Sequence, residues 1–157
     1  HLYDPESVEP LDLKNKFNIP QNYYIFLSVF KWEERKGWDI LLDAYSQTFK
    51  AEEPVCLFIH TYLFQETPEY QRKEEKVMER IEKYFKSKDH EFQGCIKILT
   101  EKYSKKDMPR LYKAANAFVL PSRGEGWGLP MMEAMAMGLP TIATNFSGVL
   151  DFMNEDN

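Results

Sequence analysis

The sequence has few of the residues that build metal centres. Its 157 residues include two cysteines, Cys56 and Cys95, and three histidines, His1, His60 and His90. The histidines share no metal-ligand spacing, and two separated cysteines are too few ligands for a zinc site. We therefore expect no metal. Both cysteines lie in apolar runs, so we interpret them as inert buried thiols in strands of a cytosolic protein.

Long hydrophobic segments and an excess of positive charge are also missing from the sequence. No apolar run approaches the ~20 residues that a transmembrane helix requires, and no signal peptide is recognisable. The formal net charge is -5, whereas a nucleic-acid-binding domain usually presents a basic face. The charged run at residues 72–76 is interpreted as a solvated helix face with local ion pairs. We expect a cytoplasmic location and no nucleic-acid partner.

What is present is a regular alternation of strands and helices. The length suffices for one domain with a sizeable core, and 43% hydrophobic residues argue against disorder. Short apolar runs predict strands at residues 23–30, 55–59, 95–99, 117–120 and 140–144. Helices are predicted at residues 37–50, 68–88 (capped by Thr67), 107–115 and 129–137, with a short one within 10–17 and another beginning at 149–153. The alternation predicts an α/β fold with a parallel sheet and right-handed crossovers.

The most informative segment is the one at residues 121–138. It follows an apolar strand, contains a turn with three glycines, and continues into a helix of strong helix formers. Such a turn presents backbone N–H groups and a helix N-terminus to a negatively charged ligand. Two carboxylates, Glu125 and Glu133, lie within it, and a carboxylate can accept hydrogen bonds from two sugar hydroxyls at once. We therefore expect the active site here.

Glu125 and Glu133 form a Glu-x7-Glu pattern inside Pro-Ser-Arg-Gly-Glu-Gly-Trp-Gly-Leu-Pro-x-x-Glu-Ala-Met-Ala-x-Gly. This segment resembles the sugar-donor signature of the retaining GT-B glycosyltransferases of family 4, also called glycosyl transferases group 1. The resemblance covers roughly residues 26–152. It implies a Rossmann-like three-layer α/β/α domain, the C-terminal half of a GT-B enzyme. The expected organisation is a connecting segment at 1–22 and a donor-binding domain at 23–157, truncated at its C-terminal end.

The resemblance implies a catalytic group of Glu125, Lys36 and Lys31. Glu125 would contact hydroxyls of the transferred sugar, and the lysine that precedes Gly37 would bind the diphosphate of the sugar donor. Lys31 stands where the family has an arginine, which keeps the charge and loses the bidentate fork. Arg35 could partly compensate for that loss.

Further residues are implied to bind the nucleotide-sugar. Glu133 would bind the ribose hydroxyls, and Thr100 would lie at the base. The residues of the turn and of the helix start would face the sugar and phosphates; they are Gly126, Trp127, Gly128 and Leu129. Ser147, after the fifth strand, would lie near the same groups. Trp127 could instead pack on another domain. His60 is either a pocket residue or a structural histidine with its hydrogen bonds satisfied, and we favour the second.

The chemistry implied is retaining transfer of a sugar from a UDP- or GDP-linked donor to an unidentified glycan, lipid or protein. Neither a cofactor nor a metal is expected, because no Asp-x-Asp is found and the cationic loop can neutralise the diphosphate. The acceptor-binding domain would precede His1, so the isolated donor-binding domain should be inactive. The acceptor-binding domain could also bring the protein to a membrane. The alternatives are a non-catalytic nucleotide-binding domain and another GT-B enzyme, such as a nucleotide-sugar epimerase.

Overall fold

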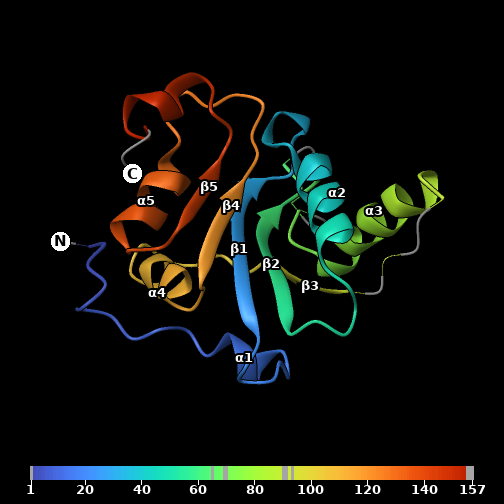
Figure 1. Ribbon diagram of the computed structural model, residues 1–157, viewed down its shortest axis with the longest axis horizontal. Helices are drawn as coiled ribbons and strands as arrows, with labels where there is room; N and C mark the ends of the chain where they lie inside the picture. The colour runs from blue at the N-terminus through green and yellow to red at the C-terminus, as the bar shows by residue number, and fades with distance from the viewer. Residues whose placement is uncertain (1, 65, 69–70, 90–91, 93, 155–157) are drawn as a thin grey trace.

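A five-stranded parallel sheet forms the centre of the protein (Figure 1). The computed structural model describes all residues except 1, 65, 69–70, 90–91, 93 and 155–157. The strands are β1 (Tyr24–Lys31), β2 (Val55–Tyr62), β3 (Cys95–Leu99), β4 (Ala117–Leu120) and β5 (Thr141–Ala143). They pair in the order β3-β2-β1-β4-β5, and every neighbouring pair is parallel. The five predicted strands and the parallel α/β class are confirmed.

The helices agree with the prediction except at two places. They are α1 (Leu13–Lys16), α2 (Trp38–Thr48), α3 (Glu74–Ser87), α4 (Asp107–Lys113) and α5 (Leu129–Ala136), with short 3-10 helices η1 (Glu34–Lys36) and η2 (Ser147–Asp151). The predicted helix start at Pro68 is wrong, because α3 begins only at Glu74. Before it, the carbonyl of Gln71 accepts a hydrogen bond from the N–H of Leu63, just after β2. Residues 69–70 lie outside the described part. The predicted last helix is a 3-10 turn.

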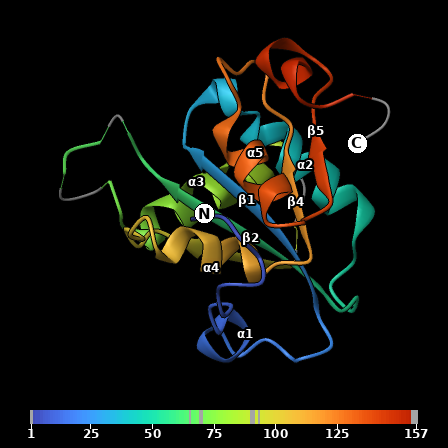
Figure 2. The same ribbon diagram turned by 90° about the vertical axis from the view of Figure 1, so that its left-hand side faces the viewer.

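Helices cover both faces of the sheet (Figure 2), with α2 and α3 on one face and α4 and α5 on the other. Side chains alternate between the faces of a strand. Phe26 packs 5.5 Å from Phe49 at the end of α2. Phe118, whose register partner is the next residue, Leu27, packs 5.8 Å from Tyr112 on α4. Burial on both faces explains why these strands are continuous apolar runs in the sequence.

The two cysteines are joined in a disulfide, so the prediction of two free buried thiols is wrong. They are 39 residues apart in the sequence, but the register of β2 and β3 pairs Cys56 with Cys95. Their Cα atoms lie 4.6 Å apart, within the range of about 4.4–6.8 Å that a disulfide can bridge. The pair lies at the amino ends of both strands. Disulfides are rare in reducing compartments, so this one counts against the expected cytoplasmic location, which stays a prediction.

The strand order reverses between β1 and β4, which makes this the switch point of the sheet. The chain runs from β1 outward to β2 and β3, then returns to place β4 on the other side of β1. Open α/β sheets bind ligands at such a switch point, beyond the carboxyl ends of the strands. Two loops begin there, residues 32–37 after β1 and residues 121–128 after β4. Figure 1 shows the two loops side by side. We call them the β1 loop and the motif loop.

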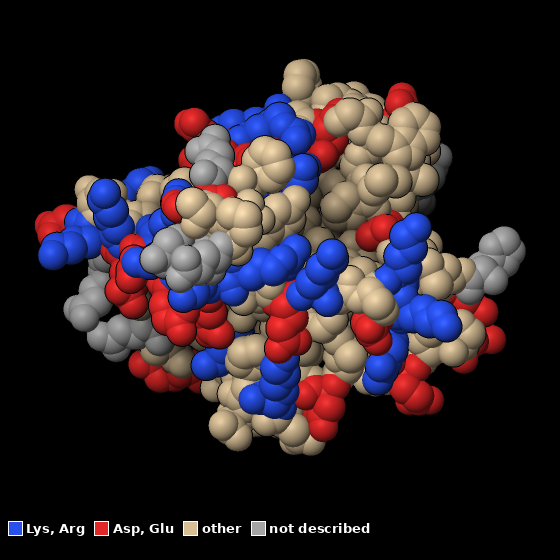
Figure 3. All heavy atoms as spheres, turned by 180° about the vertical axis from the view of Figure 1, so that it is seen from behind, with Lys and Arg blue, Asp and Glu red and all other residues tan. Residues whose placement is uncertain are grey.

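Charges of both signs are intermixed on the face seen in Figure 3, where lysines and arginines lie among aspartates and glutamates. That face has no single continuous basic patch of the kind that nucleic acids bind. The prediction of no nucleic-acid partner is consistent with this distribution and stays a prediction. Within the described residues, none of the helices combines the length and apolar composition required to traverse a bilayer.

Candidate functional site

The β1 loop and the motif loop are packed backbone against backbone. Gly37 has a φ of 66°, and a Cβ on it would lie 2.0 Å from the carbonyl oxygen of Pro121. The carbonyl of Arg35 accepts hydrogen bonds from the N–H of Arg123 at 2.8 Å and from the Ser122 hydroxyl at 3.1 Å. Only glycine combines a left-handed φ with so close an approach. The glycine that follows Lys36 is therefore required for the two loops to meet.

An ion pair ties the motif loop to the first turn of α2. Both terminal nitrogens of Arg123 bind the carboxylate of Asp39, at 2.7 and 2.6 Å, and Nη1 also donates to the carbonyl of Glu34 at 2.7 Å. The hydrogen bond from Arg123 holds the pKa of Asp39 below its usual value. Bidentate pairing fixes the direction of both side chains, so it orients the motif loop on the β1 loop.

The other side of the motif loop rests on η2. The N–H of Glu125 donates to the hydroxyl of Ser147 at 2.9 Å, and the N–H of Gly148 donates to the carbonyl of Glu125 at 3.2 Å. A Cβ on Gly148 would lie 2.3 Å from the carbonyl oxygen of Gly126. Ser147 thus lies beside the motif loop, where its hydroxyl oxygen accepts from the backbone of Glu125; its contact with the sugar donor stays a prediction.

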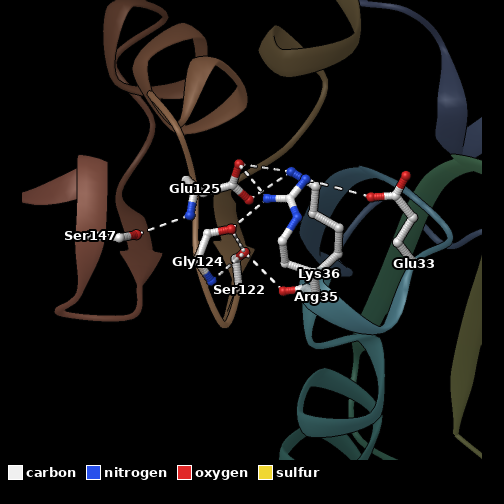
Figure 4. A network of polar contacts seen from close by, with 7 residues as sticks. All are labelled: Glu33, Arg35, Lys36, Ser122, Gly124, Glu125 and Ser147. Atoms are coloured by element: carbon white, nitrogen blue, oxygen red, sulfur yellow. Dashed lines mark hydrogen bonds and ion pairs between the residues drawn. The ribbon is translucent and has the colours of Figure 1, made fainter.

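Lys36 and Glu125 form a buried ion pair at the centre of this assembly (Figure 4). The ammonium of Lys36 lies 2.7 Å from Oε1 and 2.8 Å from Oε2, and the two side chains are only 10% and 7% exposed. Arg35 approaches the same carboxylate at 3.6 Å and donates to the carbonyl of Gly124. Arg35 is also paired with Glu33 at 3.5 Å, so the two cations and two carboxylates of this group balance, and the positive charge that suits a phosphate comes from the further cations of the neighbouring cavity, Lys31 and Arg72.

A cavity of about 310 Å³ opens beside this pair. It lies over the carboxyl ends of β1 and β2 and is lined by Val29, Phe30, Lys31, Glu33, Arg35, Lys36, His60, Thr61, Tyr62, Arg72 and Pro130. Four of these side chains are cationic and one is a carboxylate. Lys31 lies on the cavity wall with its ammonium 4.5 Å from the ring centre of Phe64. The structure therefore brings Lys31, Arg35 and Lys36 to one electropositive cavity, next to Glu125.

Arg72 lines the cavity and does not lie on a helix face. We interpreted it as part of a solvated helix face, but α3 begins two residues later and Arg72 lies in the preceding loop. Its Nη1 donates to the carbonyls of Thr100 at 2.8 Å and Glu101 at 3.3 Å, and its guanidinium lies 4.8 Å from the ring centre of Tyr62. Thr100, the residue predicted at the base, is thus connected to the cavity through Arg72.

His60 lines the cavity, and within the part of the chain that the structure describes only one of its two ring nitrogens has a hydrogen-bond partner, so the favoured interpretation as a histidine with satisfied hydrogen bonds is wrong. Its Nε2 lies 2.9 Å from the carbonyl oxygen of Glu101, and burial lowers its pKa. A neutral ring bonded to a carbonyl carries its proton on Nε2. Its Nδ1 is buried and has no hydrogen-bond partner among the described residues. His60 therefore supports the end of β3 and also lines the cavity.

The remaining predicted residues lie on and around α5. Glu133 is not among the residues that line the cavity; its Oε2 accepts a hydrogen bond at 2.9 Å from the hydroxyl of Tyr112. Gly128 caps α5 with a φ of 77°. Trp127 and Leu129 are 52% and 59% exposed. Among the described residues no three His, Cys, Asp or Glu side chains are grouped to hold a metal ion, and metal independence stays a prediction.

Comparison with known proteins identifies the family. The family model for "Glycosyl transferases group 1" matches residues 11–157. The chain belongs to this family. It is 30% identical over 155 residues to mannosylfructose-phosphate synthase of Agrobacterium fabrum, a match that covers 94% of this chain and 32% of that protein. The chain thus spans about a third of that relative's length.

Solved structures of the family share this fold. The C-terminal domain of a glycosyl transferase group 1 protein (LpcC) from Francisella tularensis superposes with a TM-score of 0.67, at 22% identity. That match covers 98% of this chain and 75% of the other. Anabaena HepE, solved in complex with UDP, gives a TM-score of 0.66 at 19% identity, covering 98% of this chain and 39% of that one. The predicted family and the C-terminal GT-B domain fold are confirmed.

Proposed function

We propose that this domain binds the nucleotide-sugar donor of a retaining glycosyltransferase. The observation that carries the proposal is the electropositive cavity over the carboxyl ends of β1 and β2, beside the pair of Lys36 with Glu125 of the family motif. Membership of glycosyl transferases group 1 supports it, as does the UDP bound to HepE, which shares the fold. The donor proposed is a UDP- or GDP-linked sugar.

The cations of the β1 loop would bind the diphosphate. Lys36, Arg35 and Lys31 line one cavity, and preorganised cations stabilise the negative charge that develops on a leaving diphosphate. The N–H groups of Gly126 and Gly128 would add backbone donors. A diphosphate could bind while the ion pair between Lys36 and Glu125 stays intact. An ammonium has three N–H donors and can bridge a carboxylate and a phosphate.

Glu125 would hold hydroxyls of the sugar. Both of its oxygens accept from Lys36, but a carboxylate offers about four acceptor positions, so two remain for hydroxyl groups. The motif loop is tied on both sides by hydrogen bonds, which fixes the position of this carboxylate before the sugar arrives. Positioning of this kind, rather than a protein nucleophile, is the contribution we assign to the domain.

We further propose that transfer requires a second domain of the same protein to hold the acceptor. GT-B chemistry takes place in the cleft between two domains, and closure of the cleft excludes water. The isolated domain should therefore bind the nucleotide-sugar and transfer no sugar at a useful rate. The acceptor, a glycan, a lipid or a protein, would be recognised by that other domain.

The test is calorimetric titration of the domain with UDP, GDP and ADP over a range of salt concentrations. A phosphate-binding lysine makes affinity fall with salt, so Lys36→Ala should weaken binding and reduce the salt dependence. Lys83→Ala, an exposed lysine on α3, is the matched control and should change neither. Failure of all three nucleotides to bind would refute the proposal and favour a non-catalytic scaffold. Assays of the isolated domain beside a two-domain protein test the requirement for the second half.

A further inference from the structure

We propose that Tyr112 is a positioning residue that orients Glu133 toward the ribose of the sugar donor. The inference rests on the donor-binding function proposed above. Tyr112 lies on α4 and Glu133 lies 21 residues later on α5, and the phenol hydroxyl donates to Oε2 of the carboxylate at 2.9 Å. Tyr112 is completely buried, whereas Glu133 is partly exposed. The hydrogen bond therefore connects a fixed core residue to a carboxylate that solvent can reach.

Aromatic rings pack on Tyr112, and one of them, Tyr3, also interacts with Glu133 through its hydroxyl. The ring of Tyr112 packs 5.8 Å from Phe118 of β4 and edge-on at 6.2 Å from Tyr3. A buried phenol hydroxyl without a partner is costly, so it needs a hydrogen-bond acceptor, and Glu133 supplies it. Burial and the charge of Glu133 raise the pKa of Tyr112. The phenol consequently stays protonated and remains a donor at neutral pH.

Positioning follows from what the bond leaves free on Glu133. The phenol of Tyr112 holds one oxygen and Tyr3 also interacts with the carboxylate; of about four acceptor positions, two remain for the hydroxyls of a ribose. A carboxylate held in one orientation does not have to be ordered when the nucleotide binds, and ordering one side chain typically costs affinity. Removing the phenol hydroxyl should therefore weaken ribose recognition by about 3- to 10-fold without touching the diphosphate site at Lys36.

The experiment compares a nucleoside diphosphate with its 2′-deoxy counterpart. Calorimetry gives the affinity of UDP or GDP, whichever binds more tightly, and of the deoxy form, for the wild type, Tyr112→Phe and Glu133→Gln. Tyr45→Phe is the control, because it also removes a hydrogen bond of a buried phenol, at 3.0 Å to the carbonyl of Cys95 at the opposite end of the sheet. Thermal unfolding of each variant is measured in parallel.

We expect the wild type to prefer the ribose form, Glu133→Gln to lose the preference, and Tyr112→Phe to lose about 3- to 10-fold of it. Affinity for pyrophosphate, which has no ribose, should stay unchanged in all of them, and Tyr45→Phe should keep the full preference. If Tyr112→Phe lowers the melting temperature and keeps the preference, the bond is only a structural tie between α4 and α5, and the proposal is overturned.

Two other outcomes would also overturn the inference, and they differ in what they say of the proposed function. If Glu133→Gln binds nucleotide and keeps the ribose preference, donor binding stands and Glu133 is not the ribose ligand. If the wild type binds no nucleotide, the donor-binding proposal fails as well. Glu133→Asp gives a second variant, because its shorter side chain cannot reach both the phenol and the ribose; retention of the preference there would contradict the mechanism.

Discussion

Removing the anion of the Lys36–Glu125 pair should destabilise the domain more than removing the cation. Glu125→Leu leaves the Lys36 ammonium 10% exposed and without its carboxylate. Removing one partner of a buried pair typically costs about 3–5 kcal/mol in the free energy of unfolding. Since a little solvent reaches both groups, we expect the lower end, about 3 kcal/mol.

Lys36→Met should cost less because Glu125 has a second cation nearby. Arg35 lies 3.6 Å from Oε2 of Glu125, and its half-exposed side chain can move closer at the expense of its hydrogen bond to the carbonyl of Gly124. The solvent-screened Arg35 pair would offset part of the loss, so we expect about 1–2 kcal/mol for Lys36→Met. The double variant leaves no unpaired buried charge. Replacing a buried ion pair by apolar residues often changes the free energy of unfolding only slightly.

The measurement is urea unfolding followed by tryptophan fluorescence for the wild type, both single variants and the double variant. Single losses of about 3 and about 1–2 kcal/mol and a nearly neutral double variant give a coupling energy of about 4–5 kcal/mol for the cycle, with the urea dependence of the unfolding free energy unchanged. Arg35→Gln combined with Lys36→Met serves as the control, since it should remove the advantage of Lys36→Met. Equal losses for the two single variants, or a double variant equal to their sum, would refute this account of the pair.

Three further outcomes are expected. Gly37→Ala should cost more than about 1 kcal/mol, because its Cβ would meet the carbonyl of Pro121 at 2.0 Å; no change in the urea midpoint would contradict the packing of the two loops. Asp39→Asn should cost about 0.5–1 kcal/mol at pH 7. Pairing with Arg123 lowers the pKa of Asp39 in the folded state, so this stabilisation is complete above the ordinary value of 3.8 and disappears as the pH falls through the lowered one; in urea titrations the difference between variant and wild type should shrink steadily as the pH falls below 3.8, and a constant difference would contradict it. Cys56→Ser should cost up to about 4 kcal/mol for a loop of 39 residues, and mass spectrometry after alkylation of the unfolded, unreduced wild type should detect no free thiol, whereas two labelled thiols would exclude the disulfide.

The sequence alone predicted the strands, the layer order and the family. The runs at residues 95–99 and 117–120 match β3 and β4 at both ends, because buried parallel strands are apolar stretches between turn residues, and that signal is local. The Glu-x7-Glu segment identified the family for the same reason. Its glycines and carboxylates lie close together in the chain, so the pattern can be recognised without the fold.

Only the tertiary structure decided which side chains meet. Lys36 and Glu125 are 89 residues apart, and they pair because β4 returns to lie beside β1. The cysteines face each other because of the register of β2 and β3, and Arg72 reaches the cavity because the loop before α3 is longer than its charge pattern suggested. Periodicity describes the environment of a residue along its own helix or strand. It contains no information on strand order or register, and these determine the contacts that build the site.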